Sequence, residues 1–300
     1  MHRYAKRSLW TLAGVVVLAG GVVAVGELLS THKKGRRIDV EMASLDIDLA
    51  QGRIEQGAYL YRTRGCLECH GANGGGRVVI DSGGMLVVGA NITPGENSAV
   101  RRYTTRDWVR TLRHGVKPDG RPVLVMPSED YNRLSDIDTA GLIRYVQQLP
   151  AVAGKPAILR FPLPLNVLYG YGVVRDAAQK IDHRLASSAP VEAGVSPAHG
   201  AYVANTCIGC HGPGLGGGKV PGGPPQWPAA ANLTPGKGSV MPNYPTVAPF
   251  RAMLRTGLRP DGSAVNRAMP FESLREMNDT DVDALYLFLK TVPPRDAGTR

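Results

Sequence analysis

Cysteine and aromatic residues are scarce in this sequence. The 300 residues include only four cysteines, too few to hold two domains together by disulfide bonds, and aromatic residues make up 6%. Glycine and proline together form a fifth of the chain but follow no period, which predicts long ordered loops and excludes a collagen-like repeat. At this length the chain has room for about two domains.

Positive charge is unevenly distributed. The formal net charge is +10, but residues 1–37 alone carry a net +6 and the remainder only +4. Most of the excess therefore flanks one apolar segment, and the rest of the chain has little excess charge for a basic face. We expect no nucleic-acid partner.

Residues 8–26 form an apolar run of 19 positions without a charge. As a helix this run would span about 28 Å, close to the hydrocarbon thickness of a bilayer. The alternative is a cleaved secretory signal, whose apolar stretch is usually about 7–15 residues and ends at a small-x-small site. No Ala-x-Ala follows here, so we expect a retained anchor in the lipid bilayer, with Trp10 near one interface and Glu27 near the other. Basic residues flank the run on both sides and do not orient it.

A tandem duplication organises the rest of the chain. Five landmarks recur in the same order, at offsets that drift from 141 to 143 residues. They are Cys-x-x-Cys-His at 66–70 and 207–211, Asn-x-Thr-Pro-Gly at 91–95 and 232–236, a stretch ending in Pro-Asp-Gly at 111–120 and 253–262, Met-Pro at 126–127 and 269–270, and a stretch ending in Asp-x-Asp at 134–138 and 277–281.

The duplication predicts the domain boundaries. We expect a membrane anchor with basic flanks at 1–37, a linker at 38–50, a first domain at 51–150, a Pro-rich interdomain linker at 151–195, a second domain at 196–293 and a tail at 294–300. Helices are expected after the N-cap residues Ser135 and Asn278. Two further helices, 104–114 and 246–256, are expected to end at glycine caps.

Cys-x-x-Cys-His is the attachment pattern of c-type haem, in which two thiols join the vinyl groups and the histidine meets the iron. Taken alone, one copy could also be a zinc half-site or a redox dithiol. Here two identical motifs use every cysteine, which predicts two covalently bound haem c groups. The expected residues are Cys66, Cys69 and His70 in the first copy and Cys207, Cys210 and His211 in the second. Haem of this type is attached outside the bacterial inner membrane, so the anchor should be single-pass with both haem domains in the periplasm.

Symmetry between the copies predicts the second axial ligand. Only Met126 and Met269 occupy matching positions, and each precedes a proline that holds the residue before it extended. The alternatives are a methionine that fills a gap in the core, or a histidine ligand from His114, His183 or His199, none of which has a histidine counterpart. His/Met ligation occupies both axial positions and favours electron transfer over binding a small molecule.

The order of these motifs resembles the multihaem cytochrome c subunits of membrane-bound bacterial alcohol, aldehyde and gluconate dehydrogenases. The stretch at 159–172 is also similar to the segment that joins haem domains there. The resemblance covers residues 51–293 and implies two class I-like cytochrome c domains. With the N-terminal transmembrane helix expected from the apolar run, the chain is expected to be all-α. It implies the ligand sets Cys66, Cys69, His70, Met126 and Cys207, Cys210, His211, Met269. Those subunits usually carry three haems and a cleaved signal, whereas this chain has two motifs.

The expected function is electron relay from a periplasmic dehydrogenase toward a respiratory acceptor, which is an oxidase, a soluble cytochrome or a quinone. The chain is expected to be an electron-transfer subunit and not itself the catalyst. One alternative is an anchored dihaem subunit of a terminal oxidase. Another is a dihaem peroxidase or thiosulfate-oxidising enzyme, which would need one iron with an open site, and two His/Met pairs argue against that reading.

Overall fold

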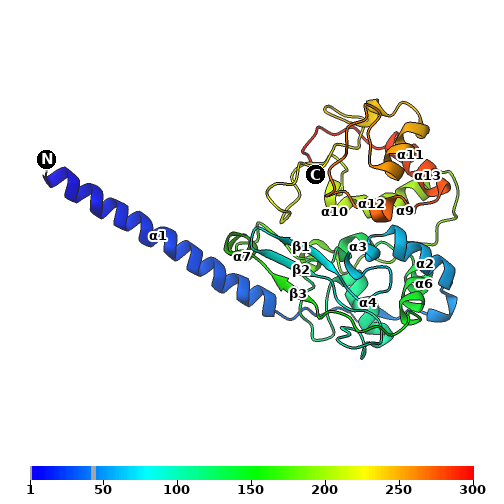
Figure 1. The fold of residues 1–300 in the computed structure, drawn as a ribbon, viewed down its shortest axis with the longest axis horizontal. Helices are drawn as coiled ribbons and strands as arrows, with labels where there is room; N and C mark the ends of the chain where they lie inside the picture. Colours follow the sequence, from blue (N-terminus) through cyan, green and yellow to red (C-terminus); the bar gives the residue numbers. More distant parts are fainter. Residues whose placement is uncertain (1, 42–44) are drawn as a thin grey trace.

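The computed structural model describes residues 2–41 and 45–300. A long helix projects from a body made of two lobes, one formed by each copy of the repeat (Figure 1). Met1 of the predicted anchor and residues 42–44 of the predicted 38–50 linker lie outside the described residues.

The projecting helix is α1 (His2–Gly35), which continues unbroken through the apolar segment. Between Lys6 and Gly35 it is long and apolar enough to cross a membrane by length and composition, and little of this part is covered by the body. The helix is consistent with a single-pass membrane anchor.

The C-terminal part of α1 packs against α7 (Leu163–Gly170), a helix of the predicted interdomain linker. Gly26 and Gly170 lie where the two helices cross, and a Cβ atom at position 170 would be 2.0 Å from the Gly26 carbonyl oxygen. The Tyr171 hydroxyl donates a hydrogen bond of 2.8 Å to the carbonyl oxygen of Val22. Glycine at both positions of the crossing therefore allows α1 to dock directly on the body.

The first lobe is built around the crossing of its first and last long helices. A Cβ atom on Gly57 would lie 2.0 Å from the carbonyl oxygen of Gly141, so glycine at 57 permits the close approach. Leu60, Val109 and Leu142 are among the buried side chains of the core. The elements are η2 (Leu49–Gln51), α2 (Ile54–Thr63), α3 (Cys66–His70), α4 (Thr105–His114), α5 (Ser128–Tyr131) and α6 (Asp136–Gln147).

The second lobe repeats this plan. A Cβ atom on Gly200 would lie 2.0 Å from the carbonyl oxygen of Ala284, the same close crossing of first and last helix. Val203, Leu254 and Val282 are buried in its core. The elements are α9 (Pro197–Ala204), η3 (Asn205–Cys207), α10 (Ile208–His211), η4 (Met241–Asn243), α11 (Val247–Thr256), α12 (Phe271–Leu274) and α13 (Asp279–Leu289).

The predicted helix ends are confirmed. The Ser135 side chain accepts from the backbone N–H of Asp138 at the start of α6, and Asn278 does the same for Asp281 at the start of α13. The helices α4 and α11 both end at a glycine in the left-handed conformation, which follows the last helical residue.

The expectation of an all-α chain is confirmed only in part, because the first lobe carries a small antiparallel sheet. Its strands are β1 (Val78–Ser82), β2 (Met85–Val88) and β3 (Ile158–Arg160), in the order β1-β2-β3. Gly83 and Gly84 join β1 to β2 with φ angles of +57° and +76°. Two consecutive left-handed residues suit a tight hairpin turn, and Val and Ile on both sides favour strands.

The predicted interdomain linker, 151–195, contains β3, α7 and α8 (Ala177–Lys180). It pairs with β2 through the register Val87↔Leu159 and supports α1 through α7. The domain boundaries drawn from the repeat stay a prediction.

Candidate functional site

Two short helices, α3 and α10, carry the Cys-x-x-Cys-His motifs. Gly65, with φ +83°, turns the chain into α3, so that Cys66, Cys69 and His70 follow within one and a half turns. The second motif starts at Cys207, the last residue of η3, and ends with His211 in α10. In both lobes the two thiols and the imidazole are half-buried and come from one continuous helical segment.

Both motif histidines are held by the same backbone hydrogen bond. The Nδ1 atom of His70 lies 2.8 Å from the carbonyl oxygen of Ala90, and that of His211 lies 2.8 Å from the carbonyl oxygen of Ala231. Burial lowers the pKa of both imidazoles. A neutral ring that donates from Nδ1 presents Nε2 as an unprotonated donor for a metal.

The Asn-x-Thr-Pro-Gly loops fix those two carbonyl groups. Asn91 is fully buried, and its Oδ1 accepts from the backbone N–H of Thr93 at 2.9 Å while its Nδ2 donates to the carbonyl oxygen of Val152 at 3.0 Å. Asn232 repeats the turn with Thr234 in the second lobe. Each asparagine directly follows the alanine whose carbonyl receives the histidine bond.

Sequence reasoning missed Ala90 and Ala231. Both act through a backbone carbonyl, so the alanine side chain gives no sign of the role. The available signal was their position immediately before the repeated asparagine.

The motif cysteines are half-buried and have raised thiol pKa values. Burial raises the pKa of Cys66 and of Cys207 to about 12 and that of Cys69 to about 11. A redox dithiol needs a lowered thiol pKa, so this environment disfavours that alternative. No disulfide joins the four cysteines, and among residues 2–41 and 45–300 there is no cluster of three or more His, Cys, Asp or Glu side chains that could hold a metal ion.

Met126 and Met269 occupy equivalent places in the two lobes. Met126 packs against the same core cluster as Cys66, and Met269 against the same cluster as Cys207. Each is half-buried and precedes a proline that begins a one-turn helix, α5 or α12. The lobes thus bring each methionine into the domain that carries its motif, while its bond to iron stays a prediction.

The remaining methionines of the lobes fill the cores. They are buried side chains at positions with no methionine in the other copy: Met85, Met241, Met253 and Met277.

The three other candidate histidines have partners of their own. His114 and His183 stack on each other with ring centroids 5.3 Å apart, and Nε2 of His199 lies 2.7 Å from Asp281. These contacts agree with the interpretation of all three as packing residues.

The donor set of each lobe fits a covalently bound haem. It consists of two thiols three residues apart, an imidazole with Nδ1 bonded and Nε2 free to coordinate, and a thioether in the same cluster. These are the groups that attach the porphyrin and supply two axial ligands.

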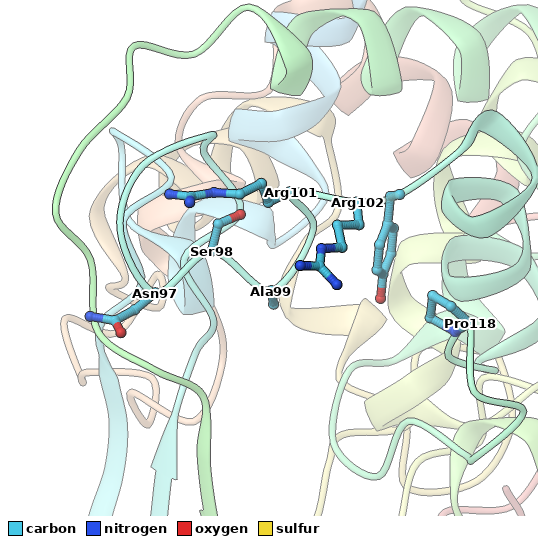
Figure 2. A pocket seen from close by; sticks show the side chains of 7 residues that line it. Asn97, Ser98, Ala99, Arg101, Arg102 and Pro118 are labelled. Atoms are coloured by element: carbon cyan, nitrogen blue, oxygen red, sulfur yellow. The ribbon is translucent and has the colours of Figure 1, made fainter.

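A surface hollow of about 330 Å³ lies away from these residues (Figure 2). Its lining includes Arg102, Tyr103 and Pro118, and Arg101 points away from Arg102 to donate to the carbonyl oxygen of Gly95. It contains none of the predicted haem residues.

Both lobes match families of haem proteins. Residues 52–146 match the family model described as "Cytochrome C oxidase, cbb3-type, subunit III", and residues 197–293 match the model described as "Cytochrome c".

Three cytochrome proteins are also similar to this chain. The chain is 31% identical over 134 residues to the fructose dehydrogenase cytochrome subunit of Gluconobacter japonicus, covering 42% of this chain and 27% of that protein. It is 32% identical over 103 residues to the cytochrome c subunit of the quinone-type alcohol dehydrogenase of Gluconobacter oxydans, covering 33% and 22%. A diheme cytochrome c-type protein of Cereibacter sphaeroides is 25% identical over 271 residues, which cover 81% and 86%. The aligned part thus spans about a quarter of the two dehydrogenase subunits and most of the diheme protein.

Proposed function

Because the chain is a c-type cytochrome with two cytochrome c domains and two covalently bound haem c groups, we propose that it is a membrane-anchored electron-transfer subunit. It accepts electrons from a periplasmic dehydrogenase and relays them between its two haems toward a respiratory acceptor. The acceptor is an oxidase, a soluble cytochrome or a quinone. The relatives named as dehydrogenase cytochrome subunits support the dehydrogenase as donor.

Four residues of each lobe would hold one haem. Cys66 and Cys69 would attach the first porphyrin, and His70 and Met126 would ligate its iron; Cys207, Cys210, His211 and Met269 would hold the second haem in the same way. A haem with these ligands exchanges single electrons and has a raised reduction potential. The Ala90 and Ala231 carbonyls orient each imidazole, and burial of the ring favours its neutral form.

The observation that carries the proposal is the equivalence of the two donor sets. Each lobe has a histidine bonded to an alanine carbonyl and a methionine before a one-turn helix. If a histidine and a methionine ligate the iron in each lobe, neither iron would have a position left for a substrate. An electron relay needs two haem irons whose axial positions are both occupied, whereas a peroxidase needs one iron with an axial position open to its substrate.

The anchor gives the relay its location. We propose that α1 crosses the inner membrane once and that both lobes lie in the periplasm, where haem of this type is attached. The docking of α1 on α7 supports a body held close to the membrane surface. A mature protein whose N-terminus lies at residues 26–32 would contradict the retained anchor.

Co-purification tests the proposal. The protein, tagged at its C-terminus, is isolated from detergent-solubilised membranes together with its partners. The expected result is a dehydrogenase in the complex, with both haems reduced on addition of that enzyme's substrate. A matched preparation with His70→Ala should retain the dehydrogenase but show incomplete haem reduction. Isolation without any dehydrogenase, or no haem reduction by substrate, would contradict the proposed donor.

A second candidate function is an anchored dihaem subunit of a terminal oxidase. The match of residues 52–146 to the cbb3-type oxidase subunit III model favours it. The same isolation separates the two: oxidase subunits in place of a dehydrogenase, and loss of oxidase assembly when this chain is deleted, would support the second function.

A further inference from the structure

Two tyrosines at equivalent positions of the repeat bond across the boundary between the lobes. Tyr59, in α2 of the first lobe, donates from its hydroxyl to Oδ2 of Asp281 in the second lobe at 2.8 Å. Tyr202, in α9 of the second lobe, donates to Oδ2 of Asp138 in the first at 2.5 Å. Tyr59 matches Tyr202, and Asp138 matches Asp281, each at an offset of 143 residues.

Each tyrosine oxygen also accepts a backbone hydrogen bond at the same helix start. The N–H of Asn278 donates to the Tyr59 hydroxyl, and the N–H of Ser135 donates to the Tyr202 hydroxyl, both at 3.0 Å. Each hydroxyl thus closes the N-terminus of the last helix of the other lobe. The tyrosine of each lobe contacts the aspartate of the other lobe, and the two contacts involve equivalent residues. Such a reciprocal pair of contacts is the signature of a two-fold interface.

The haem-attachment segments lie on the same boundary. Glu68, between the cysteines of the first motif, accepts from the backbone N–H of Ser273 in α12 at 3.0 Å. At the equivalent place of the second motif, the backbone of Gly209 lies against the Asp130 carboxylate in α5. Figure 1 shows α9, α10 and α12 along the edge of the second lobe that faces α2 and α3 of the first. Each Cys-x-x-Cys-His segment therefore lies on the face that its lobe turns toward the other lobe.

The two tyrosine contacts differ in their surroundings. Asp281 is buried and also meets Nε2 of His199 at 2.7 Å and the Arg64 guanidinium at 3.5 Å. Asp138 is half-buried and has neither partner. The Tyr59 contact is thus part of a buried cluster with His199 and Arg64, whereas the hydroxyl of Tyr202, itself buried, meets the half-buried Asp138 carboxylate and the Ser135 N–H.

We propose that the Tyr59–Asp281 and Tyr202–Asp138 hydrogen bonds are positioning devices that fix the placement of one haem domain against the other. By holding the two attachment faces together, they set the rate at which an electron passes between the haems. The inference rests on the proposed relay and names residues that touch neither iron. The inference assigns a role to the tyrosine of the Gly-Ala-Tyr sequence that occurs at 57–59 and again at 200–202, and to the last aspartate of the repeated Asp-x-Asp segments.

The test uses the full-length holoprotein in detergent and the variants Tyr59→Phe, Tyr202→Phe and the pair combined. The control is Tyr286→Phe, which removes a hydroxyl bonded to the Tyr244 carbonyl within one lobe. Intramolecular electron transfer is followed after rapid photoreduction, and the coupled Soret circular dichroism signal of the two haems reports their mutual orientation. One hydrogen bond contributes about fivefold to the ratio of docked to undocked lobes, and two contribute about 25-fold.

In the double variant the interhaem rate should fall at least about twofold and the coupled signal should shrink, with haem content, midpoint potentials and low-spin spectra unchanged. Tyr286→Phe should match the wild type. A double variant with the rate and coupled signal of the wild type would overturn the proposal.

A second pair of variants covers the case in which the double variant does not fold. Asp138→Asn keeps an oxygen that accepts from Tyr202, so its interhaem electron-transfer rate should stay near that of the wild type. Asp138→Ala removes this acceptor and should lower the rate. Equal rates in the two would overturn the proposal. Because photoreduction needs no dehydrogenase, a chain that passes these tests but isolates without one refutes only the proposed donor.

Discussion

Nδ1 of His70 lies 2.8 Å from the carbonyl oxygen of Ala90, and the loop that presents this carbonyl is pinned by the buried side chain of Asn91. His211, Ala231 and Asn232 repeat the arrangement. The orientation of the motif imidazole thus depends on an amide side chain in the loop that presents the carbonyl.

Asn91→Ala should destabilise the first domain by about 2–3 kcal/mol, because it leaves the buried Thr93 N–H and the Val152 carbonyl without their partner. Thermal unfolding of the holoprotein, followed at the haem absorbance, measures the change. The exposed Asn243→Ala is the control and should stay within about 0.5 kcal/mol of wild type. A loss equal to that of the control would contradict the role of the loop.

Met126→His should lower the potential of the first haem and leave the second near its original value, because a thioether favours the ferrous state and an imidazole does not. A shift of roughly 0.1–0.3 V is expected within the range of about 0.8 V that axial ligands cover. Met269→His should do the converse, and the buried Met253→Leu should change neither potential. Spectroelectrochemical titration resolves the two waves, and equal shifts in both would contradict the assignment.

Gly170→Ala should loosen the anchor from the body, because the added Cβ would lie 2.0 Å from the Gly26 carbonyl oxygen. The protein should remain in carbonate-washed membranes, but protease should cut residues 36–50 several times faster than in wild type. Gly194→Ala, at a glycine with open space around it, is the matched control. Unchanged cleavage would show that the contact does not hold the body in place.

Stability should fall in mild acid because of His114. Burial, with the neighbouring His183 and the nearby Arg113 and Arg110, lowers the pKa of His114 to about 4. Since an unfolded histidine binds a proton below about pH 6.5, its contribution is complete above that pH and is lost as the pH falls toward 4.

His114→Thr, which copies the equivalent Thr256, should flatten the dependence of Tm on pH between 6.5 and 4. Thr256→Ser, at the equivalent position of the second lobe, introduces no titratable group and is the control; it should leave the slope as in the wild type. The same slope in His114→Thr as in the control would contradict the assignment.

The sequence predicts the main helices and the candidate haem residues because each motif occurs twice, at matching positions of the two copies. Ser135 and Asn278 are recognisable N-caps in matching places, and Met126 and Met269 stand out only when the copies are aligned. The β1–β2 hairpin was not predicted, because it occurs in one copy of the repeat and so gives no repeated pattern. Its turn depends on Gly83 and Gly84.

Other features could not be predicted for a physical reason. The Ala90 carbonyl belongs to the backbone, which carries no side-chain pattern. The repeat marks Tyr59 and Asp281 as repeated positions, but only the packing of the lobes reveals that they bond to each other.

The central claim, two closed His/Met haems in one relay, is tested most directly on the wild-type holoprotein. The oxidised protein should show two low-spin haems, with the weak far-red sulfur-to-iron band at the intensity of two, and the reduced protein should bind carbon monoxide slowly or not at all. Met126→Ala, which removes one axial ligand, should bind carbon monoxide at one of its two haems. A high-spin haem in the wild type, or rapid carbon monoxide binding to one of its two haems, would contradict the relay and favour an enzyme with an open site.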